Sequence, residues 1–137
     1  MTALTNQKLI TRPQLVVAHA NAGYAQSVSH YYHRLGWDSH LASSGLEARQ
    51  LVRELGPAVV VLGTDWPGES GWLTCGKLLD EHPDLKVVLV TERSTPINRR
   101  FASFLGAAAL VNEEGGVHTL AEELGTVVEG QLLVAGN

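Results

Sequence analysis

Residues 56–71 are Gly-Pro-Ala-Val-Val-Val-Leu-Gly-Thr-Asp-Trp-Pro-Gly-Glu-Ser-Gly, and they contain the clearest strand signal of the chain. The apolar residues Ala58–Leu62 do not alternate with polar ones, which is typical of a parallel strand covered on both faces. The Gly-Pro pair before this run and the Pro-Gly pair after it favour turns. Two more runs of the same kind, Leu15–Val17 and Val87–Val90, lie far enough away along the chain to leave room for helices between them.

Short apolar runs alternate with longer segments of helical periodicity along the whole chain. This order is typical of parallel βαβ units, in which right-handed crossovers place helices on both faces of one sheet. The predicted strands are Gln14–Ala18, Ser39–Ala42, Ala58–Leu62, Lys86–Thr91 and Ala108–Val111. Four of the predicted helices follow Asn21, Ser44, Ser70 and Thr95, and a fifth is marked by the apolar residues Val117, Leu120, Leu124, Val127 and Val128. The pattern predicts an α/β fold of (βα)5 type with three layers.

Residues at the predicted helix ends support this order. Asn21 is a candidate N-cap, and Thr95 is another, with Pro96 at the first helical position. Ser44 and Glu47 form a capping box, in which Ser44 accepts from the amide of Glu47 and Glu47 accepts from the amide of Ser44. On the helix after Thr95, the apolar residues lie on one side: Ile97, Phe101, Phe104 and Leu105.

Composition indicates one ordinary globular domain. The chain has 137 residues, 45% of them apolar, and 14 acidic against 10 basic residues give a net charge of −4. No basic stripe is present, so we expect no nucleic-acid binding by this domain. The domain is expected over residues 13–131, between a flexible N-terminal tail (1–12) and a C-terminal tail (132–137).

Cysteine content and hydropathy indicate where the chain acts. Cys75 is the single cysteine, which excludes an intrachain disulfide and a cysteine-based zinc site and favours the cytoplasm. We expect Cys75 to fill space in the core. No apolar run approaches the roughly 20 residues that cross a bilayer, so no membrane association is expected.

Five segments in register resemble the receiver domain of bacterial response regulators. The similarity extends from about Gln14 to about Glu129 and rests on the following segments: Ser44–Ala48, Gly56–Leu62, Pro67–Gly71, His82–Thr91 and Phe104–Val111. The resemblance implies a flavodoxin-like fold with sheet order 2-1-3-4-5. It also implies a role in two-component signal transduction, including transcription regulation.

The same resemblance implies that the phosphorylation chemistry is missing. The position of the family's phosphoacceptor aspartate is Gly63, and its Mg²⁺-binding acidic pair corresponds to Ala18 and His19. Magnesium prefers carboxylate and water oxygens, so neither a metal nor another cofactor is expected. The family's lysine corresponds to Glu113, or to Asn112 if the register shifts by one. Of the family's functional residues only the hydroxyl remains, as Thr91, and the aromatic switch position is Leu110. Phosphoryl transfer depends on charge placement and metal, so we expect a phosphorylation-independent signalling module that is not an enzyme.

Several alternatives remain open around this degenerate pocket. Asp65, two residues beyond the missing acceptor, is a candidate substitute phosphoacceptor or a solvated loop residue. His19, Asp65 and Glu113 are a candidate transition-metal set; otherwise His19 fills the space left by the lost acids and bonds to a backbone carbonyl or water. A small-molecule site lined by Trp66, His19 and Asn21 is a third possibility.

Other polar and aromatic groups carry weaker alternatives. His30 and His33 have the spacing of a two-histidine metal face but lack a third ligand. Backbone amides near Asn21 are a candidate anion site, against a simple N-cap. Trp66 and Trp72 either form an exposed partner-binding patch or cover the mouth of the pocket.

The resemblance also implies an interaction surface made of the fourth helix, the fifth strand and the fifth helix. Its candidate residues are Arg99, Arg100, Phe101, Leu110, Glu122 and Glu123. The arginines and glutamates could pair across a two-fold axis in a homodimer. The expected partner is another protein or the chain's own output domain.

Overall fold

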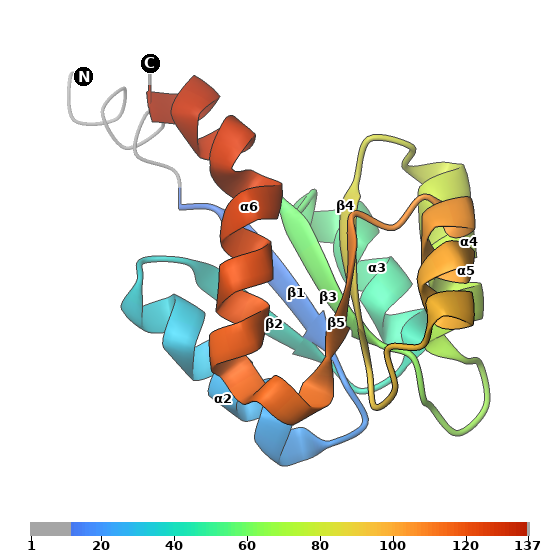
Figure 1. Cartoon of the computed structure of the whole chain (residues 1–137). Helices are drawn as coiled ribbons and strands as arrows, with labels where there is room; N and C mark the ends of the chain where they lie inside the picture. The colour runs from blue at the N-terminus through green and yellow to red at the C-terminus, as the bar shows by residue number, and fades with distance from the viewer. Residues whose placement is uncertain (1–11, 137) are drawn as a thin grey trace, which may run out of the picture.

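A five-stranded parallel sheet with the order β2-β1-β3-β4-β5 organises the molecule (Figure 1). The computed structural model describes the backbone of residues 12–136 and the side chains of residues 12–128. The strands are β1 (Gln14–Ala18), β2 (Asp38–Ala42), β3 (Val59–Gly63), β4 (Lys86–Thr91) and β5 (Ala109–Asn112). The predicted flavodoxin-like sheet order is confirmed.

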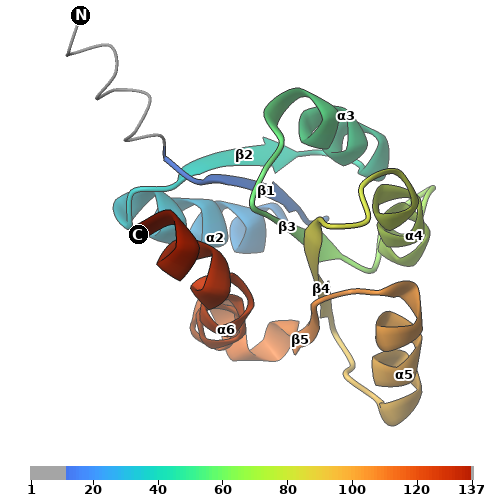
Figure 2. The same ribbon diagram turned by 90° about the horizontal axis from the view of Figure 1, so that it is seen from above.

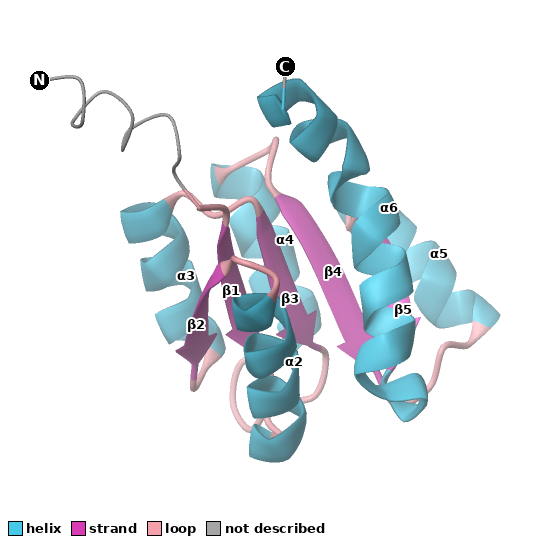
Figure 3. Cartoon of the chain, turned by 90° about the vertical axis from the view of Figure 1, so that its left-hand side faces the viewer, coloured by secondary structure: helices cyan, strands magenta, loops and turns pink. Residues whose placement is uncertain are grey.

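Helices alternate with the strands and cover both faces of the sheet. They are α2 (Ala22–Arg34), α3 (Gly45–Leu55), α4 (Gly71–Glu81), α5 (Pro96–Leu105) and α6 (Gly116–Gly136). In Figures 2 and 3, α2 and α6 lie on one face and α3, α4 and α5 on the other. A short 3₁₀ helix, η1 (Glu113–Gly115), joins β5 to α6 and is absent from the sequence prediction.

Two apolar cores lie on opposite faces of the sheet, as unalternating strands require. Val59 and Val61 of β3 pack under α2 and α6, whereas Val60 and Leu62 pack under α3, α4 and α5. All four side chains are fully buried. Cys75 is also fully buried, in the second core, and burial raises the pKa of its thiol to about 11. The prediction that Cys75 fills core space is confirmed.

The predicted caps form, with one correction. Asn21 and Thr95 accept hydrogen bonds from the amides of Tyr24 and Asn98. Ser44 accepts from the amide of Glu47 at 3.1 Å. Glu47, however, accepts from the amide and hydroxyl of Ser43 rather than from the amide of Ser44. The Glu47 carboxylate therefore connects the first turn of α3 to the loop that follows β2.

The ends of the chain differ from the sequence prediction. The N-terminal tail expected over residues 1–12 lies outside the described residues, apart from Arg12. At the other end, α6 continues to Gly136 and includes most of the segment expected to be a tail, 132–137. No proline interrupts this segment, so nothing local stops the helix at residue 131. Within the described residues, no helix combines the length and apolar content needed to cross a membrane.

Candidate functional site

The carboxyl end of the sheet is centred on His19, directly after β1. Its side chain is only 7% exposed. The ring Nδ1 accepts a hydrogen bond from the amide of Asn21 at 3.0 Å, which assigns the proton to Nε2. Nε2 lies 2.8 Å from Glu113 Oε1. His19 therefore joins the end of β1 to η1, the turn that follows β5.

The His19 ring lies against Gly63, the last residue of β3. A Cβ atom added at Gly63 would lie 2.8 Å from His19 Cδ2, closer than carbon atoms approach in proteins. The imidazole thus occupies the space into which any side chain at position 63 would project. Gly63 and His19 are complementary in shape, and a larger residue at 63 requires the ring to move.

Tyr24, at the start of α2, covers the other side of the imidazole. The two ring centroids are 4.6 Å apart. Burial, with a further contribution from the Glu113 carboxylate, raises the pKa of Tyr24 to about 12. A phenol with this pKa stays neutral at physiological pH, so Tyr24 adds no charge to the site.

Carboxylates surround the hollow beside His19. It has a volume of about 270 Å³, and Asp65, Glu92 and Glu113 contribute to its lining. Among the residues that the structure describes, no lysine or arginine lines it. A transferred phosphoryl group carries negative charge, so this lining would repel it.

The remaining predicted pocket residues lie elsewhere. Ala18 is fully buried and belongs to the core beneath α3 and α4. Thr91 is 5% exposed, and its Oγ1 accepts from the amide of Arg93 at 3.4 Å. The sequence therefore located His19, Asp65 and Glu113 at one hollow, while Thr91 bonds within its own loop.

The metal-site alternatives do not form. His19 and Glu113 are in contact, but no three histidine, cysteine or carboxylate side chains between residues 12 and 128 are placed to hold a metal ion. In this arrangement neither the His19, Asp65 and Glu113 set nor a set that includes His30 and His33 is assembled as a group of metal ligands. His19 cannot turn toward Asp65 without giving up its bonds to Asn21 and Glu113.

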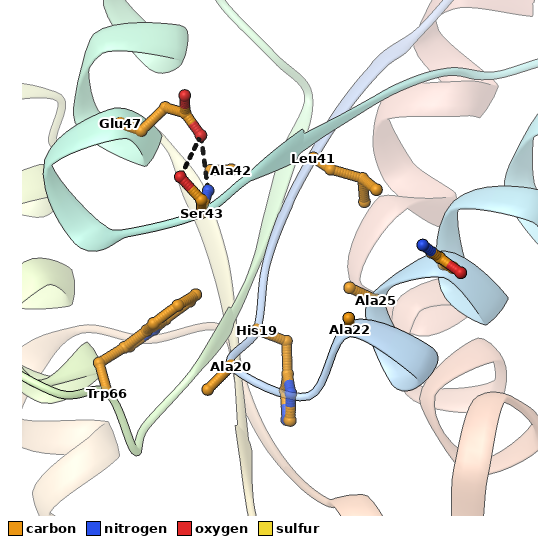
Figure 4. Close-up of a pocket in the computed structure, with 10 residues that line it drawn as sticks. His19, Ala20, Ala22, Ala25, Leu41, Ala42, Ser43, Glu47 and Trp66 are labelled. Carbon is orange, nitrogen blue, oxygen red and sulfur yellow. Dashed lines mark hydrogen bonds between the residues drawn. The ribbon is translucent and has the colours of Figure 1, made fainter.

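A second hollow of about 280 Å³, whose lining is drawn in Figure 4, shares His19 and Ala20 with the acidic hollow. Trp66, Leu41 and Glu47 line it, together with several alanines. The indole Nε1 of Trp66 is buried and has no hydrogen-bond partner among residues 12–128. Asn21 lines the acidic hollow instead and caps α2 with its side chain. The three residues proposed for a small-molecule site therefore do not share one cavity, and Asn21 acts as an N-cap.

Trp66 and Trp72 also separate. Trp72 packs on Phe101 of α5, with ring centroids 5.1 Å apart, whereas Trp66 lines the hollow beside His19. The prediction of one exposed patch that combines both indoles is wrong, because the turn between them directs Trp66 toward the sheet and Trp72 toward α5.

Sequence analysis missed a polar cluster around Glu69, in the loop before α4. The Glu69 carboxylate accepts from Thr74 Oγ1 and from Lys77 Nζ, the latter at 2.6 Å, and Arg49 Nη2 lies 3.7 Å away. Hydrogen bonds from Lys77 and Thr74 lower the pKa of Glu69. No local sequence signal marks this cluster, because Arg49 comes from a different helix.

Gly71 shows why the loop after β3 needs glycine where α4 begins. A Cβ at this position would lie 1.9 Å from the carbonyl oxygen of Gly63. The amide of Gly71 donates to the carbonyl of Thr64 at 3.0 Å. The first turn of α4 is thus packed directly on the end of β3.

Known proteins with similar sequences are response regulators. GacA of Pseudomonas protegens is 35% identical over 95 residues, which are 69% of this chain and 44% of that protein. GacA of Pseudomonas aeruginosa is 33% identical over 95 residues, again 69% of this chain and 44% of that protein. The chain spans less than half the length of these relatives. No model of a known protein family matches it.

Solved receiver structures share the fold. Chemotaxis protein CheY4 of Vibrio cholerae superimposes with a TM-score of 0.79 at 17% identity, over 85% of this chain and 99% of that one. A CheY-like receiver domain from Methanospirillum hungatei gives 0.81 at 16% identity, over 88% and 97%. A DNA-binding response regulator of the LuxR family from Staphylococcus aureus gives 0.72 at 25% identity, over 84% and 98%.

Proposed function

Because the chain belongs to the receiver (CheY-like) domain family of response regulators, we propose that it is a degenerate receiver, which signals through protein contacts without being phosphorylated. The observation that carries this proposal is the placement of His19 over Gly63. The resemblance assigns position 63 to the phosphoacceptor, and here an imidazole occupies the space of that side chain. Nothing at this position can form an acyl phosphate.

Electrostatics support the same proposal. The resemblance assigns acids to the end of β1 and a lysine to the end of β5, whereas this chain has His19 at the first place and Glu113 at the second. The two groups bond to each other at 2.8 Å, so the polar atoms at both strand ends are already satisfied. Phosphoryl transfer requires a metal and a cation around the transferred group. Without the acidic pair and the lysine that would hold them, phosphorylation has no means to switch this pocket between two states.

The test is exposure of the chain to acetyl phosphate, and separately to beryllofluoride, each with Mg²⁺. We expect no mass increase and no change in the amide NMR spectrum. A receiver that retains its acceptor aspartate serves as the positive control. An adduct on any residue lining the acidic hollow contradicts the proposal. An adduct that disappears in Asp65→Asn would identify the chain as an atypical receiver that uses Asp65.

The partner is proposed to dock on the edge formed by α5, β5 and α6. Arg99 and Arg100 on α5 and Glu122 and Glu123 on α6 are exposed there. Leu110 of β5 is partly buried and packs against the apolar core under α3, α4 and α5. Among the residues the structure describes, Arg100 and Glu123 enter no ion pair. Exposed charges of this kind steer and orient a protein partner.

Charge reversal tests this edge. Co-purification from cells with the wild-type chain as bait should recover a partner that Arg99→Glu or Glu123→Lys loses, whereas Glu54→Lys on α3 should keep it. Recovery that is equal for all three variants would place the docking site elsewhere. We propose that the chain acts in the cytoplasm and that it is a regulator rather than an enzyme.

A further inference from the structure

Helix α5 directs most of its apolar side outward. Ala102 is its one buried residue, at 4% exposure, and Leu105 is partly buried. By contrast Ile97 is 74%, Phe101 43% and Phe104 84% exposed. Helices in globular proteins gain most of their stability by burying an apolar face. The outward residues of α5 therefore lack the cover that such a face requires.

The neighbouring helix α4 extends this apolar surface. Leu73 of α4 is 52% exposed. Trp72 packs on Phe101, which in turn stacks on Phe104 with ring centroids 6.5 Å apart. Figures 1 and 2 show α4 and α5 side by side at one end of the sheet. A groove of about 660 Å³ lies between them, lined by Trp72, Leu73, Gly76, Phe101 and Leu105. We call this groove, with Ile97 and Phe104, the α4–α5 face.

The size of this surface matches what a stable homodimer requires. A large side chain buries roughly 150–250 Å², so the exposed fractions of Leu73, Ile97, Phe101 and Phe104 correspond to roughly 500 Å² of apolar surface. A standard interface buries about 800 Å² on each partner, and homodimer interfaces are about 65% apolar. Each copy must then supply roughly 500 Å² of apolar area.

The face also has the two parts that a two-fold interface needs. Phe104 projects from it, and the groove beside Phe101 is a recess on the same surface. In an isologous dimer, each surface supplies the projection that fills the recess of the other.

The border of the face carries both an acidic and a basic residue, so two copies of the face have complementary charges. Asp80 lines the groove on α4, and Arg100 lies one turn before Phe104 on α5. Neither takes part in an ion pair within the described residues. In the two-fold arrangement proposed below, the acidic Asp80 of each copy is the candidate partner of the basic Arg100 of the other. Lys77, the other charged residue of the groove, is already bonded to Glu69.

We propose that the α4–α5 face binds a second copy of the chain in a two-fold dimer, with Phe104 of each copy inserted between α4 and α5 of the other. This face replaces the α5–β5–α6 edge that the sequence suggested for a homodimer and leaves that edge to another protein. The dimer does not depend on phosphorylation, so its test is independent of the test of the proposed function.

The first experiment measures the mass of the full chain by light scattering and sedimentation equilibrium over a range of concentrations. We expect a concentration-dependent dimer. Phe104→Asp should weaken it at least 30-fold, as expected for an interface hot spot worth about 2 kcal/mol. Leu46→Asp is the matched control, because Leu46 is 57% exposed but lies on α3, and its dimer should equal that of wild type. Thermal unfolding verifies that each variant is folded.

The second experiment exchanges the two charges. Asp80→Arg and Arg100→Asp should each weaken the dimer, and the double variant should recover most of the lost affinity because the pair is restored with opposite polarity. A wild-type chain that stays monomeric up to about 1 mM overturns the proposal, since an affinity weaker than that is worth only about 4 kcal/mol. A dimer indifferent to Phe104→Asp, a double variant without recovery, or a different protein on this face also overturns it.

Discussion

His19 and Gly63 define the site at the level of single residues. The imidazole ring of His19 occupies the space beside Gly63, which has no side chain. Hydrogen bonds to Asn21 and Glu113 hold the ring in one orientation. The resemblance to receivers predicted that the acceptor and metal ligands are missing. One alternative drawn from the sequence had His19 fill the space left by the lost acids, but bonded it to a backbone carbonyl or water rather than to Glu113.

Substituting Gly63 tests this packing. Gly63→Ala should lower the free energy of unfolding by about 1–3 kcal/mol, the usual cost of overpacking a core, because the new methyl group meets His19 Cδ2. In a His19→Ala background the same change should cost less than half as much, because the obstructing ring is gone. Urea unfolding of the four proteins measures the coupling.

Gly125→Ala is the matched control. Gly125 lies on the exposed side of α6, and nothing lies within 4 Å of an added Cβ. Alanine is a better helix former than glycine by about 1 kcal/mol, so this variant should be equally or more stable. Equal costs for Gly63→Ala with and without His19 would show that the ring does not restrict position 63.

Among the five α-helices, α5 has the fewest buried residues in the described part of the chain. Its ends are well formed, with Thr95 accepting from the amide of Asn98 at 3.1 Å and Gly106 ending it at φ 91°. Only Ala102 among its residues is buried. The helix therefore depends on its caps more than α3 or α4 does.

Removal of the cap should loosen α5 locally. An N-cap is worth about 1 kcal/mol, so Thr95→Ala should speed amide hydrogen exchange in α5 about fivefold and leave α3 unchanged. The measurement belongs in the Phe104→Asp background, where dimerisation does not protect the helix. Ser103→Ala, an exposed serine of the same helix, is the control and should leave exchange nearly unchanged. Equal acceleration in α3 and α5 would indicate that α5 opens only with the whole domain.

For the whole molecule, the Glu69 cluster links α3, α4 and the loop after β3. Hydrogen bonds from Lys77 and Thr74 lower the pKa of Glu69, so the folded chain holds its proton less tightly than the unfolded chain does. Its contribution to stability is full above the ordinary glutamate pKa of 4.5 and is lost as the pH falls through the lowered value.

Glu69→Gln should therefore be less stable than wild type at pH 7, and the difference should shrink as the pH falls below about 4.5. Urea unfolding across this pH range measures the effect. Glu81→Gln, an exposed residue at the end of α4, should follow the wild-type curve. A gap between Glu69→Gln and wild type that stays constant down to pH 3 would contradict the role of the charged carboxylate.

The amino-acid sequence was sufficient to predict the fold, and the resemblance it carries led to the proposal that the phosphorylation chemistry is missing. Strand runs, caps such as Ser44 and Thr95, and the stop at Gly106 are local signals that act within a few residues. The absence of an acceptor at Gly63 is likewise a matter of residue identity at a recognisable position. These features need no knowledge of which distant residues meet.

The tertiary structure was needed for everything that depends on contacts between distant segments. His19 meets Glu113 across the sheet, Arg49 meets Glu69 between helices, and Ile97 and Phe104 lie outside the core even though their spacing is that of a buried stripe. Apolar periodicity indicates that a helix has an apolar side, but whether that side meets the sheet or the solvent follows from how the helix packs. The exposed apolar side of α5, and with it the proposed dimer, could emerge only from that packing.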